Sequence, residues 1–484
     1  MQKNNKLGAK LWITVILFGL VGQIAWIVEN MYFNVYIDRT MSTNPFAISI
    51  MVGASAIVAT FATLIGGIWS DKIGHRKYFM SIGYIVWGLS IMAFSLIKVS
   101  NMQEWFGLSR SNSVIMAITF VVLMDCVMTY IGSTSNDACF NAWVTDNTNT
   151  RNRGRIEGVL AIMPLLATGL VFGVFDGMTQ DTYKNPLTGE TKLGWAEGWQ
   201  KIQTGNWTLF FVILGSIIIL VGIISLFLIK DSPTLKPNET SKFKNMFYGF
   251  KPKIIKENKN LYLTLVAMGL IGIANNSFMA YLIMYIERTL GFSNYIIPVG
   301  IIIFGAAVSS VIFGFWVDNK LKDRRKTMIP LVIIYVFGAL FMLVASPLCF
   351  EKGSIALMVM LCIGGFILMG TNLCLATVLT ATTRDLTPID KIGLFQGVRM
   401  FFWVLIPMII GPLVTAIINS GSPIVAEDTV NNIVIRNYTP LMFIASAIAG
   451  GLAIIPVVLL NKASLEEMHP FDDNNINSES LEVN

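Results

Sequence analysis

Three acidic residues interrupt long apolar runs of the chain. Glu29 lies in the first run, and Asp125 and Asp137 lie in the fourth. A charge at the centre of a bilayer costs at least about 2.5–3.5 kcal/mol, so an acid in such a place is a candidate for function. A carboxyl group removed from water exchanges protons nearer neutral pH. We therefore expect all three acids to couple proton movement to the activity; for Asp137, a structural role as a helix cap or interface pair is the alternative.

Polar and aromatic side chains accompany the first acid. At 100° per residue, the first run has a broad polar face on one side and an apolar stripe on the other, formed by Ile24, Ile27, Val28, Met31 and Val35. The polar face carries Gln23, Trp26, Glu29, Asn30, Asn34 and Tyr36. In lipid such a face must meet a cavity or another helix. The amides could bond substrate hydroxyls and Trp26 could stack on a sugar ring; hydrogen bonding and packing between helices are the alternatives.

The second half of the chain offers a different set of candidates. The seventh run carries Asn275 and Asn276, and the eleventh carries Arg399 and Trp403, with Gln396 on the same side. Arg399 is the only cation within a run. It could pair with an acid, stack on Trp403, or extend to the inner interface. The predicted substrate-binding residues are therefore Gln23, Trp26, Glu29, Asn30, Asn34, Asn275, Asn276, Arg399 and Trp403.

Composition indicates the class of protein that these residues serve. Charged residues make up 13% of the 484 residues and hydrophobic residues 54%, whereas a soluble domain carries about 25% charge. This is too little charge to cover soluble domains, so we predict a polytopic membrane protein. The net charge of +6 does not indicate nucleic-acid binding, because the basic residues are scattered through short loops.

The sequence offers almost nothing for metal or covalent chemistry. The five cysteines lie in or beside apolar runs without a Cys-x-x-Cys pair, and the two histidines, His75 and His469, lie in a loop and in the tail. There is no phosphate-binding loop for ATP. We predict no enzyme activity, no cofactor and no metal, with H⁺ as the coupling ion and Na⁺ as the alternative.

Twelve segments are long and apolar enough to span a bilayer as helices. They are 11–37, 45–69, 78–98, 113–142, 155–175, 206–229, 260–286, 295–317, 328–349, 354–381, 393–418 and 438–460. If the N-terminus is cytoplasmic, 25 of the 35 Lys and Arg residues lie inside. This bias predicts an all-α protein of the cell membrane with both termini in the cytoplasm.

The spans divide into two sets of six. We predict an N-terminal six-helix bundle over 1–229, a basic cytoplasmic linker over 230–259, a C-terminal six-helix bundle over 260–462 and an acidic disordered tail over 463–484. The polar outer segment 176–205 has no function that the sequence reveals.

The two halves repeat one another in the same orientation. The matching segments are 36–40 with 285–289, 67–77 with 314–326, and 146–158 with 385–397. Three matches in order, at the ends of equivalent helices, indicate duplication. Equal orientation makes them parallel repeats, related by an axis along the membrane normal.

The loop after the second span has the pattern Gly67-x-x-x-Asp71-Lys72-x-Gly74-x-Arg76-Lys77. It resembles the signature loop of the major facilitator superfamily, and the twelve spans in two parallel halves fit that family. The resemblance implies alternating access, with this loop latching the halves. Its glycines permit a tight turn, and Asp71 can cap a helix; the alternative is that the basic residues only set orientation. The predicted gating residues are Gly67, Asp71, Gly74, Arg76, Lys77 and Asp318.

Within that superfamily the chain resembles the glycoside–pentoside–hexuronide:cation symporters, of the melibiose-permease and sucrose-transporter type. The evidence is Ser70-Asp71-Lys72, Arg76-Lys77-x-Phe79 with Gly83, the acid in the fourth span, and Asn136-Asp137 ahead of 141–146. The second span lacks the acids of melibiose permease, which favours protons over sodium.

That resemblance implies an importer of a sugar or glycoside, and we expect a monomer. An exporter of amphipathic compounds and a permease-like receptor are the alternatives. Against the exporter, Pro164 follows Met163 and not the glycine of the drug-antiporter signature.

Overall fold

The computed structural model describes residues 8–148, 153–232, 235, 237, 248–321, 323–388 and 392–464. The chain forms two compact units. The first unit comprises Met1–Phe243 together with Pro423–Asn437, and the second comprises Lys244–Ser422 and Tyr438–Asn484. The segment Pro423–Asn437 thus packs with the first unit, although the sequence analysis places it in the second half.

Twelve helical segments within the described residues are long and apolar enough to cross a membrane, which confirms the predicted all-α fold. They are Ala9–Thr40, Pro45–Ile73, Arg76–Leu96, Arg110–Asp146, Gly158–Thr179, Trp207–Leu228, Lys259–Met279, Ile296–Val317, Arg324–Val344, Ile355–Leu386, Gly397–Asn419 and Met442–Asn461.

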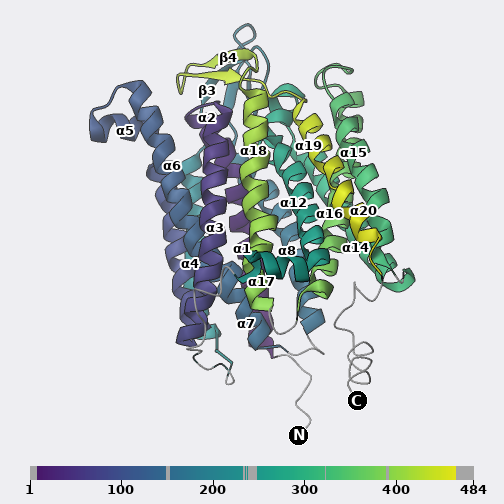
Figure 1. Ribbon diagram of the computed structural model, residues 1–484. Coiled ribbons are helices and arrows are strands. Elements are labelled where there is room, and N and C mark those ends of the chain that lie inside the picture. Colours follow the sequence, from purple (N-terminus) through teal and green to yellow (C-terminus); the bar gives the residue numbers. More distant parts are fainter. Residues whose placement is uncertain are drawn as a thin grey trace, which may run out of the picture. The chain divides into compact units, whose positions relative to one another are not determined.

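The first unit contains six spans, a short helix between spans and five strands (Figure 1). Its helices are α1 (Ala9–Ile27), η1 (Val28–Tyr32), α2 (Phe33–Thr40), α3 (Pro45–Ile73), α4 (Arg76–Ala93), η2 (Phe94–Leu96), α5 (Val99–Phe106), α6 (Arg110–Gly132), η3 (Ser133–Phe140), α7 (Asn141–Asp146), α8 (Arg153–Leu170), η4 (Val171–Phe175), α9 (Asp176–Thr179) and α10 (Trp207–Leu228). Its strands are β1 (Thr182–Lys184), β2 (Thr191–Leu193), β3 (Gln200–Gln203), β4 (Ile424–Asp428) and β5 (Ile433–Arg436).

All the regular elements of the second unit within the described residues are helices. Its elements are α11 (Pro252–Glu257), α12 (Lys259–Met279), α13 (Leu282–Met284), η6 (Tyr285–Thr289), α14 (Ile296–Lys320), η7 (Arg324–Thr327), α15 (Met328–Val344), α16 (Ile355–Leu386), α17 (Ile392–Met400), η9 (Phe401–Leu405), α18 (Ile406–Asn419), α19 (Met442–Leu452) and α20 (Ile454–Asn461).

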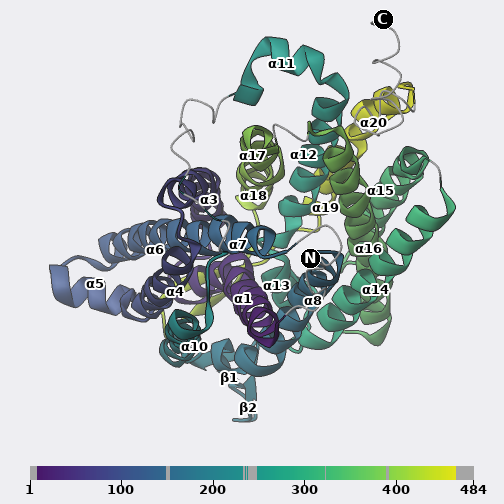
Figure 2. The same ribbon diagram turned by 90° about the horizontal axis from the view of Figure 1, so that it is seen from below.

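The two units use the same packing scheme. In the first, α1 packs on α8, α3 on α6, and α4 on α10. In the second, α12 packs on α18, α14 on α16, and α15 on α19. Figure 2 looks along these helices and shows the partners side by side within each unit. Each pair in the first unit joins the same two spans, counted within its half, as the corresponding pair in the second unit. The packing therefore supports the duplication inferred from the sequence.

Close backbone approach explains one glycine pair. Gly88 of α4 and Gly215 of α10 face each other, and a Cβ atom on either would lie 2.5 Å from the other's carbonyl oxygen. No side chain fits there, so only glycine allows the two helices to approach this closely. This contact fixes where α4 and α10 cross.

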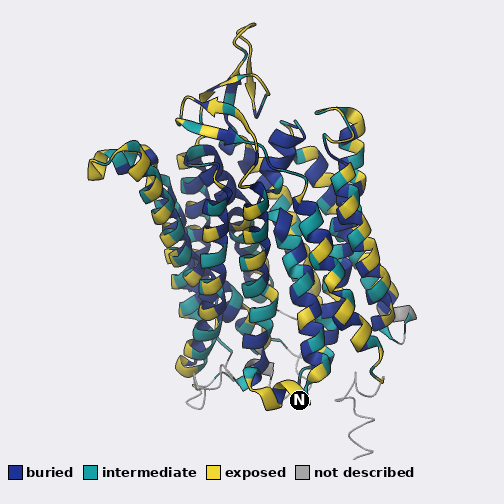
Figure 3. Ribbon diagram, turned by 45° about the horizontal axis from the view of Figure 1, so that its top comes forward, coloured by how far each residue is buried: buried dark blue, intermediate teal, exposed yellow. Residues whose placement is uncertain are grey.

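Large apolar side chains cover the outside of the helices. Ile115, Leu123 and Val127 are exposed along α6, and Phe304, Val311 and Phe315 along α14. Figure 3 shows exposed and partly exposed residues running along the length of α6. In water such a surface would drive association, whereas in a bilayer it contacts lipid.

The strands gather at one end of the first unit, which we call the strand end. β1 pairs antiparallel with both β2 and β3, and β4 pairs antiparallel with β5. Tyr183, Trp195 and Ile435 form a small buried core between the strands, with Trp199 and Ala426 against it. The β4–β5 hairpin therefore packs on the segment 183–199 of the first unit.

Candidate functional site

Two of the predicted coupling acids are buried beside one another in the first unit. Glu29 of η1 is 5% exposed and Asp125 of α6 is 1% exposed, and their charges interact. The Thr129 hydroxyl donates a hydrogen bond to Glu29 Oε1 at 2.8 Å, and Ser55 of α3 lies near Asp125. Within the described part of the chain, Glu29 Oε2 and Asp125 Oδ1 have no hydrogen-bond partner. Among the described residues, no cation pairs with either carboxyl group.

The third acid, Asp137, lies farther along the same span, in η3. It is partly exposed and contacts the side chains of Ser133, Asn136 and Trp26. Asn136 is itself buried and accepts a hydrogen bond from the Tyr84 hydroxyl at 2.9 Å. Asp137 therefore lies among polar and aromatic side chains of α1 and η3.

Turns of π-helix carry two of these acids. Glu29 lies in η1, and Asp137 lies in η3. A π turn inserts an extra residue into the helix and redirects the side chains that follow, and such turns are frequent at functional sites. This explains why the faces predicted at 100° per residue drift: Val28 and Val35 of the apolar stripe are as deeply buried as Glu29.

The remaining candidates of the first span differ in exposure. Gln23 and Trp26 are partly exposed, and the Trp26 ring lies 5.2 Å from that of Trp87. Asn30 is exposed and donates to the Trp26 carbonyl. Asn34 is buried, donates to the Asn30 carbonyl and has an unpartnered Oδ1. Trp26 and Asn30 thus remain accessible, whereas Asn34 is enclosed by its own unit.

The candidates of the second unit lie on α12, α17 and η9. Asn275 Oδ1 is buried without a partner, and Asn276 donates to the Gly272 carbonyl at 2.9 Å. Arg399 is partly exposed, forms no ion pair among the described residues and is near the like charge of Arg384. Trp403 is 37% exposed. The side chain of Gln396 lies outside the described residues.

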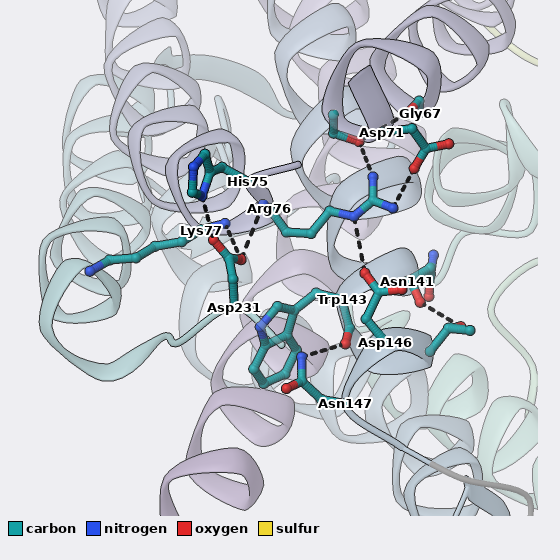
Figure 4. Close-up of polar contacts among 12 residues, drawn as sticks. Gly67, Asp71, His75, Arg76, Lys77, Asn141, Trp143, Asp146, Asn147 and Asp231 are labelled. Carbon is teal, nitrogen blue, oxygen red and sulfur yellow. Dashed lines mark hydrogen bonds and ion pairs between the residues drawn. The ribbon is translucent and has the colours of Figure 1, made fainter. Parts of the chain in front are cut away.

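Arg76 is the centre of the predicted gating loop (Figure 4). Its guanidinium donates hydrogen bonds to Ser70 Oγ, to Asp71 Oδ1 and, at 3.2 Å, to Asp146 Oδ2. Ser70 and Asp71 end α3, and Asp146 ends α7. One buried cation thus joins the ends of two spans within the first unit.

The N-terminus of α4 is capped by a residue that the sequence analysis missed. Asp231 accepts hydrogen bonds from the backbone N–H groups of Arg76 at 3.1 Å and Lys77 at 2.9 Å. Its other carboxylate oxygen lies 3.3 Å from His75 Nδ1 (Figure 4). Asp71, which the sequence offers as a possible helix cap, binds the Arg76 side chain here.

The two glycines of the loop differ in role. Gly74 ends α3 with φ of +70°, a left-handed conformation, and a Cβ there would lie 2.8 Å from the Pro237 nitrogen. It supplies the tight turn expected from the sequence. Gly67 has open space beside it, so no close contact within the described residues requires glycine there.

An equivalent ion pair occurs in the second unit. Arg324 Nη2 lies 3.2 Å from Asp385 Oδ2, and these residues match Arg76 and Asp146 in the repeat. Asp318 lies in α14, and its side chain is outside the described residues. The cation–carboxylate contact between equivalent loop ends has thus been kept in both halves.

A second charged centre, at the strand end, was not foreseen. Lys201 of β3 is 2% exposed and lies 2.7 Å from Asp181 Oδ2 and 2.8 Å from Asp428 Oδ2. Its third hydrogen bond goes to the Arg39 carbonyl at 3.0 Å. Burial raises the pKa of the Asp181 carboxyl above its ordinary value, although Lys201 and Arg39 act in the opposite direction. This cluster joins β3 to the β4–β5 hairpin.

No metal site is found within the part of the chain that the structure describes: no three His, Cys, Asp or Glu residues there are grouped to hold an ion. Of the predicted coupling acids, Glu29 accepts a hydrogen bond from the Thr129 hydroxyl instead. Proton exchange and hydrogen bonding to a polar solute are the chemistry that this set supports.

Comparison with known proteins gives the family. The family model for the Major Facilitator Superfamily matches residues 11–412, whereas a comparison with curated protein sequences finds no match. Among solved structures, a bacterial homolog of the human lysosomal transporter Spinster is similar, at 14% identity and TM-score 0.64, covering 96% of this chain and 99% of that one.

Two further solved structures are similar over the whole fold. The nucleoside transporter NupG has 11% identity and TM-score 0.60, over 95% of this chain and 100% of its own. The xylose transporter XylE from E. coli has 13% identity and TM-score 0.62, over 93% of this chain and 95% of its own. Identities this low show the fold alone. The chain belongs to the Major Facilitator Superfamily, and it is a multi-pass membrane transporter and not an enzyme.

Proposed function

We propose that this transporter is a proton-coupled symporter that imports a sugar or glycoside. The observation that carries the proposal is the buried pair of Glu29 and Asp125, which have no cationic partner among the described residues. A buried carboxylate without a counter-charge is costly, and binding a proton removes that charge. Such a pair suits a carrier whose charge state changes during its cycle.

The coupling step follows from this pair. Two like charges close together in a low-dielectric site resist simultaneous ionisation, so we expect the pair to take up and release a proton during the cycle. Protonation neutralises the site and favours reorientation of the loaded carrier. We assign Asp125 as the principal coupling residue, Glu29 as a residue shared between coupling and substrate binding, and Asp137 as the next acid along the span.

The substrate assignment rests on the polar residues of both units. Trp26 is partly exposed beside Trp87, which suits stacking against a sugar ring. Gln23, Asn30 and Asn34 supply amides for hydroxyl groups in the first unit. In the second unit, Asn275, Asn276, Arg399 and Trp403 are the corresponding candidates.

The similarity to XylE and the finer sequence resemblance to melibiose-permease-type symporters favour a sugar. The missing acids of the second span favour H⁺ over Na⁺. We further propose that the protein acts as a monomer in the cell membrane, with both termini in the cytoplasm, and that the Arg76 loop and its repeat around Arg324 and Asp318 act as the gate.

The test uses purified protein in proteoliposomes with a panel of labelled sugars. Accumulation is driven by a pH gradient, and counterflow is measured without one. The wild type should do both, and Asp125→Asn should lose uphill accumulation but keep exchange, because exchange needs no net proton movement. Glu29→Gln should weaken substrate binding more than coupling.

Several results would contradict the proposal. Accumulation that follows a Na⁺ gradient alone would make sodium the coupling ion. Full pH-driven accumulation in Asp125→Asn would show that Asp125 is not the coupling residue, and Asp137 would then be tested in the same way. Extrusion of amphipathic compounds without uptake of any sugar would make the protein an exporter.

A further inference from the structure

A cavity at the strand end of the first unit has the features of an anion-binding site. It has a volume of about 420 Å³ and is lined by the end of α2, the beginnings of α5, α6 and α10, and the tip of the β4–β5 hairpin. All of these elements belong to the first unit. None of the coupling acids Glu29, Asp125 and Asp137 is among the residues that line the cavity.

Two cations line the cavity, and no acid does. Lys98 and Arg110 are among the lining residues, whereas the described lining contains neither Asp nor Glu. Asp428 contacts this wall through Asn431, and Asp181 accepts a hydrogen bond from the Gly205 N–H of the lining. Both carboxylates are already bound to Lys201. The lining therefore keeps a net positive charge.

Three helices begin at the cavity. Lys98 precedes α5, Arg110 is the first residue of α6, and Trp207 is the first residue of α10. The first N–H groups of a helix have no partner within the helix, and its N-terminus carries partial positive charge. Helix N-termini bind phosphate and carboxylate groups for this reason. Three of them meeting at one cavity reinforce the charge of the two side chains.

Two buried donors of lining residues have no acceptor among the described residues. Trp207 is 3% exposed, and its indole Nε1 has no hydrogen-bond partner there. Arg110 uses one Nη to bond the Asn431 carbonyl, but its Nε is buried and unpaired. A buried donor left without an acceptor costs about 1–3 kcal/mol. Neighbouring atoms cover both donors in this structure, so an acceptor that displaced this cover from the cavity side would remove the cost.

We propose that this cavity binds an oxyanion group, a phosphate or carboxylate, through Arg110, Lys98 and the Trp207 indole. The group can belong to a free solute or to the headgroup of an anionic lipid, because Lys and Trp are both common at the level of lipid headgroups. Bound there, it would also connect the hairpin tip to the beginnings of α6 and α10. The site is independent of the proposed sugar–proton symport.

The test measures binding to the purified full-length protein in maltoside micelles, which contain no phosphate. Inorganic phosphate is titrated at constant ionic strength against chloride, so that screening does not vary, and binding is followed by calorimetry and by the shift in Tm. A second arm compares nanodiscs of phosphatidylcholine with nanodiscs containing phosphatidylglycerol, and measures which lipid stays with the protein after extraction.

Arg110→Gln should weaken phosphate affinity at least about tenfold, because it removes a charge-assisted hydrogen bond. Trp207→Phe keeps the ring but removes the donor, and should weaken affinity about three- to tenfold. Lys192→Gln, on exposed β2, and Trp105→Phe, on exposed α5, are the matched controls and should bind as the wild type does.

Phosphate binding that depends on Arg110 and Trp207 supports a solute site, and selective retention of phosphatidylglycerol with the same dependence supports a lipid site. If Arg110→Gln does not fold, Lys98→Gln replaces it. The proposal is overturned if the wild type binds neither probe, or if both variants bind like the controls. Neither result depends on sugar transport, so its failure is distinguishable from failure of the symport proposal.

Discussion

Replacing Lys201 should release the β4–β5 hairpin from the first unit. The ammonium group donates to Asp181, Asp428 and the Arg39 carbonyl, so all three of its N–H donors are used. Both carboxylates are at most 3% exposed. Lys201→Gln leaves two buried acids without a counter-charge, and breaking one partner out of a buried ion pair costs about 3–5 kcal/mol.

Because Asp428 ends β4, we expect this cost to appear mainly as more frequent local opening of the hairpin. An increase of about 3 kcal/mol in the free energy of the closed state makes opening on the order of 150-fold more frequent. Hydrogen–deuterium exchange with mass spectrometry would detect this change in peptides covering 424–436. Lys192→Gln, on the exposed strand β2 of the same sheet, is the control and should exchange like the wild type.

A charge-neutral variant gives the sharper comparison. Lys201→Met combined with Asp181→Asn and Asp428→Asn removes all the charges but keeps the side-chain oxygens that accept from the Gly205, Val430 and Asn431 backbone. It should recover most of the lost protection. Unchanged exchange of 424–436 in Lys201→Gln, or equal exchange in the two variants, would refute the reasoning that an uncompensated charge opens the hairpin.

The same cluster predicts a dependence on pH. Burial raises the pKa of Asp181 in the folded protein, so the folded state binds this proton more tightly than the unfolded chain does. Stability from this group is therefore greatest below the ordinary pKa of Asp and decreases as the pH rises through the raised value. In Lys201→Gln, the attraction of Lys201 for the Asp181 carboxylate is gone, so the buried carboxylate is easier to protonate. Protonation at low pH removes its uncompensated charge. The difference in hydrogen exchange between the variant and the wild type should therefore shrink as the pH is lowered.

Three further changes test the packing and the loop. Gly88→Val should destabilise the protein by about 1–3 kcal/mol, because its Cβ would lie 2.5 Å from the Gly215 carbonyl oxygen; Gly169→Ala, with open space beside it, is the thermal-unfolding control. Asp231→Ala should cost about 1 kcal/mol through loss of the α4 cap, and Asp231→Asn should recover part of the lost Tm. Asp146→Asn should lower the transport rate but leave ligand affinity unchanged in equilibrium binding, and a changed affinity with an unchanged rate would argue against a gate.

Hydropathy and the repeat predicted most of the fold. Spanning helices need long apolar runs, so their number and approximate bounds can be found from composition along the chain. The Arg76 loop was found for a similar reason: its residues are adjacent in sequence, and the second half repeats them. Features that depend on residues far apart in sequence were harder to find. Asp231 caps α4 from 154 residues beyond Lys77, and no local pattern indicates that pairing.

The strand end was missed although a signal for it exists. Two short runs rich in β-branched residues, Ile424-Val425 and Ile433-Val434-Ile435, flank an Asn431-Asn432 turn. Asn432 has φ of +56°, the left-handed conformation that Asn tolerates in turns. The pattern predicts a hairpin, but it does not indicate that the hairpin packs on residues 183–201 of the other half. That choice depends on Lys201 and on the buried core around Trp195.

The helix faces were only partly predictable because π turns change their phase. A constant 100° per residue groups Glu29 with Asn30 and Trp26, and it places Val28 and Val35 on the opposite side. With η1 in the span, Glu29 is buried against Thr129 while Asn30 is exposed. The residue types were sufficient to identify candidates, but the local helix geometry decides which of them meet.

Duplication kept the loop ion pair and the packing scheme, but the two halves then acquired different polar groups. Arg76–Asp146 and Arg324–Asp385 have the same 3.2 Å separation in equivalent places, as expected if both halves need the same contact at the same end. The buried acids Glu29 and Asp125 occur in the first unit, whereas the spans of the second unit contribute Asn275 and Arg399 as their candidates. A carrier that moves a proton with a neutral solute needs its titrating group in only one half. The asymmetry of charge within a symmetric packing scheme is therefore what the proposed symport predicts, with the first unit titrating and the second helping to bind the solute.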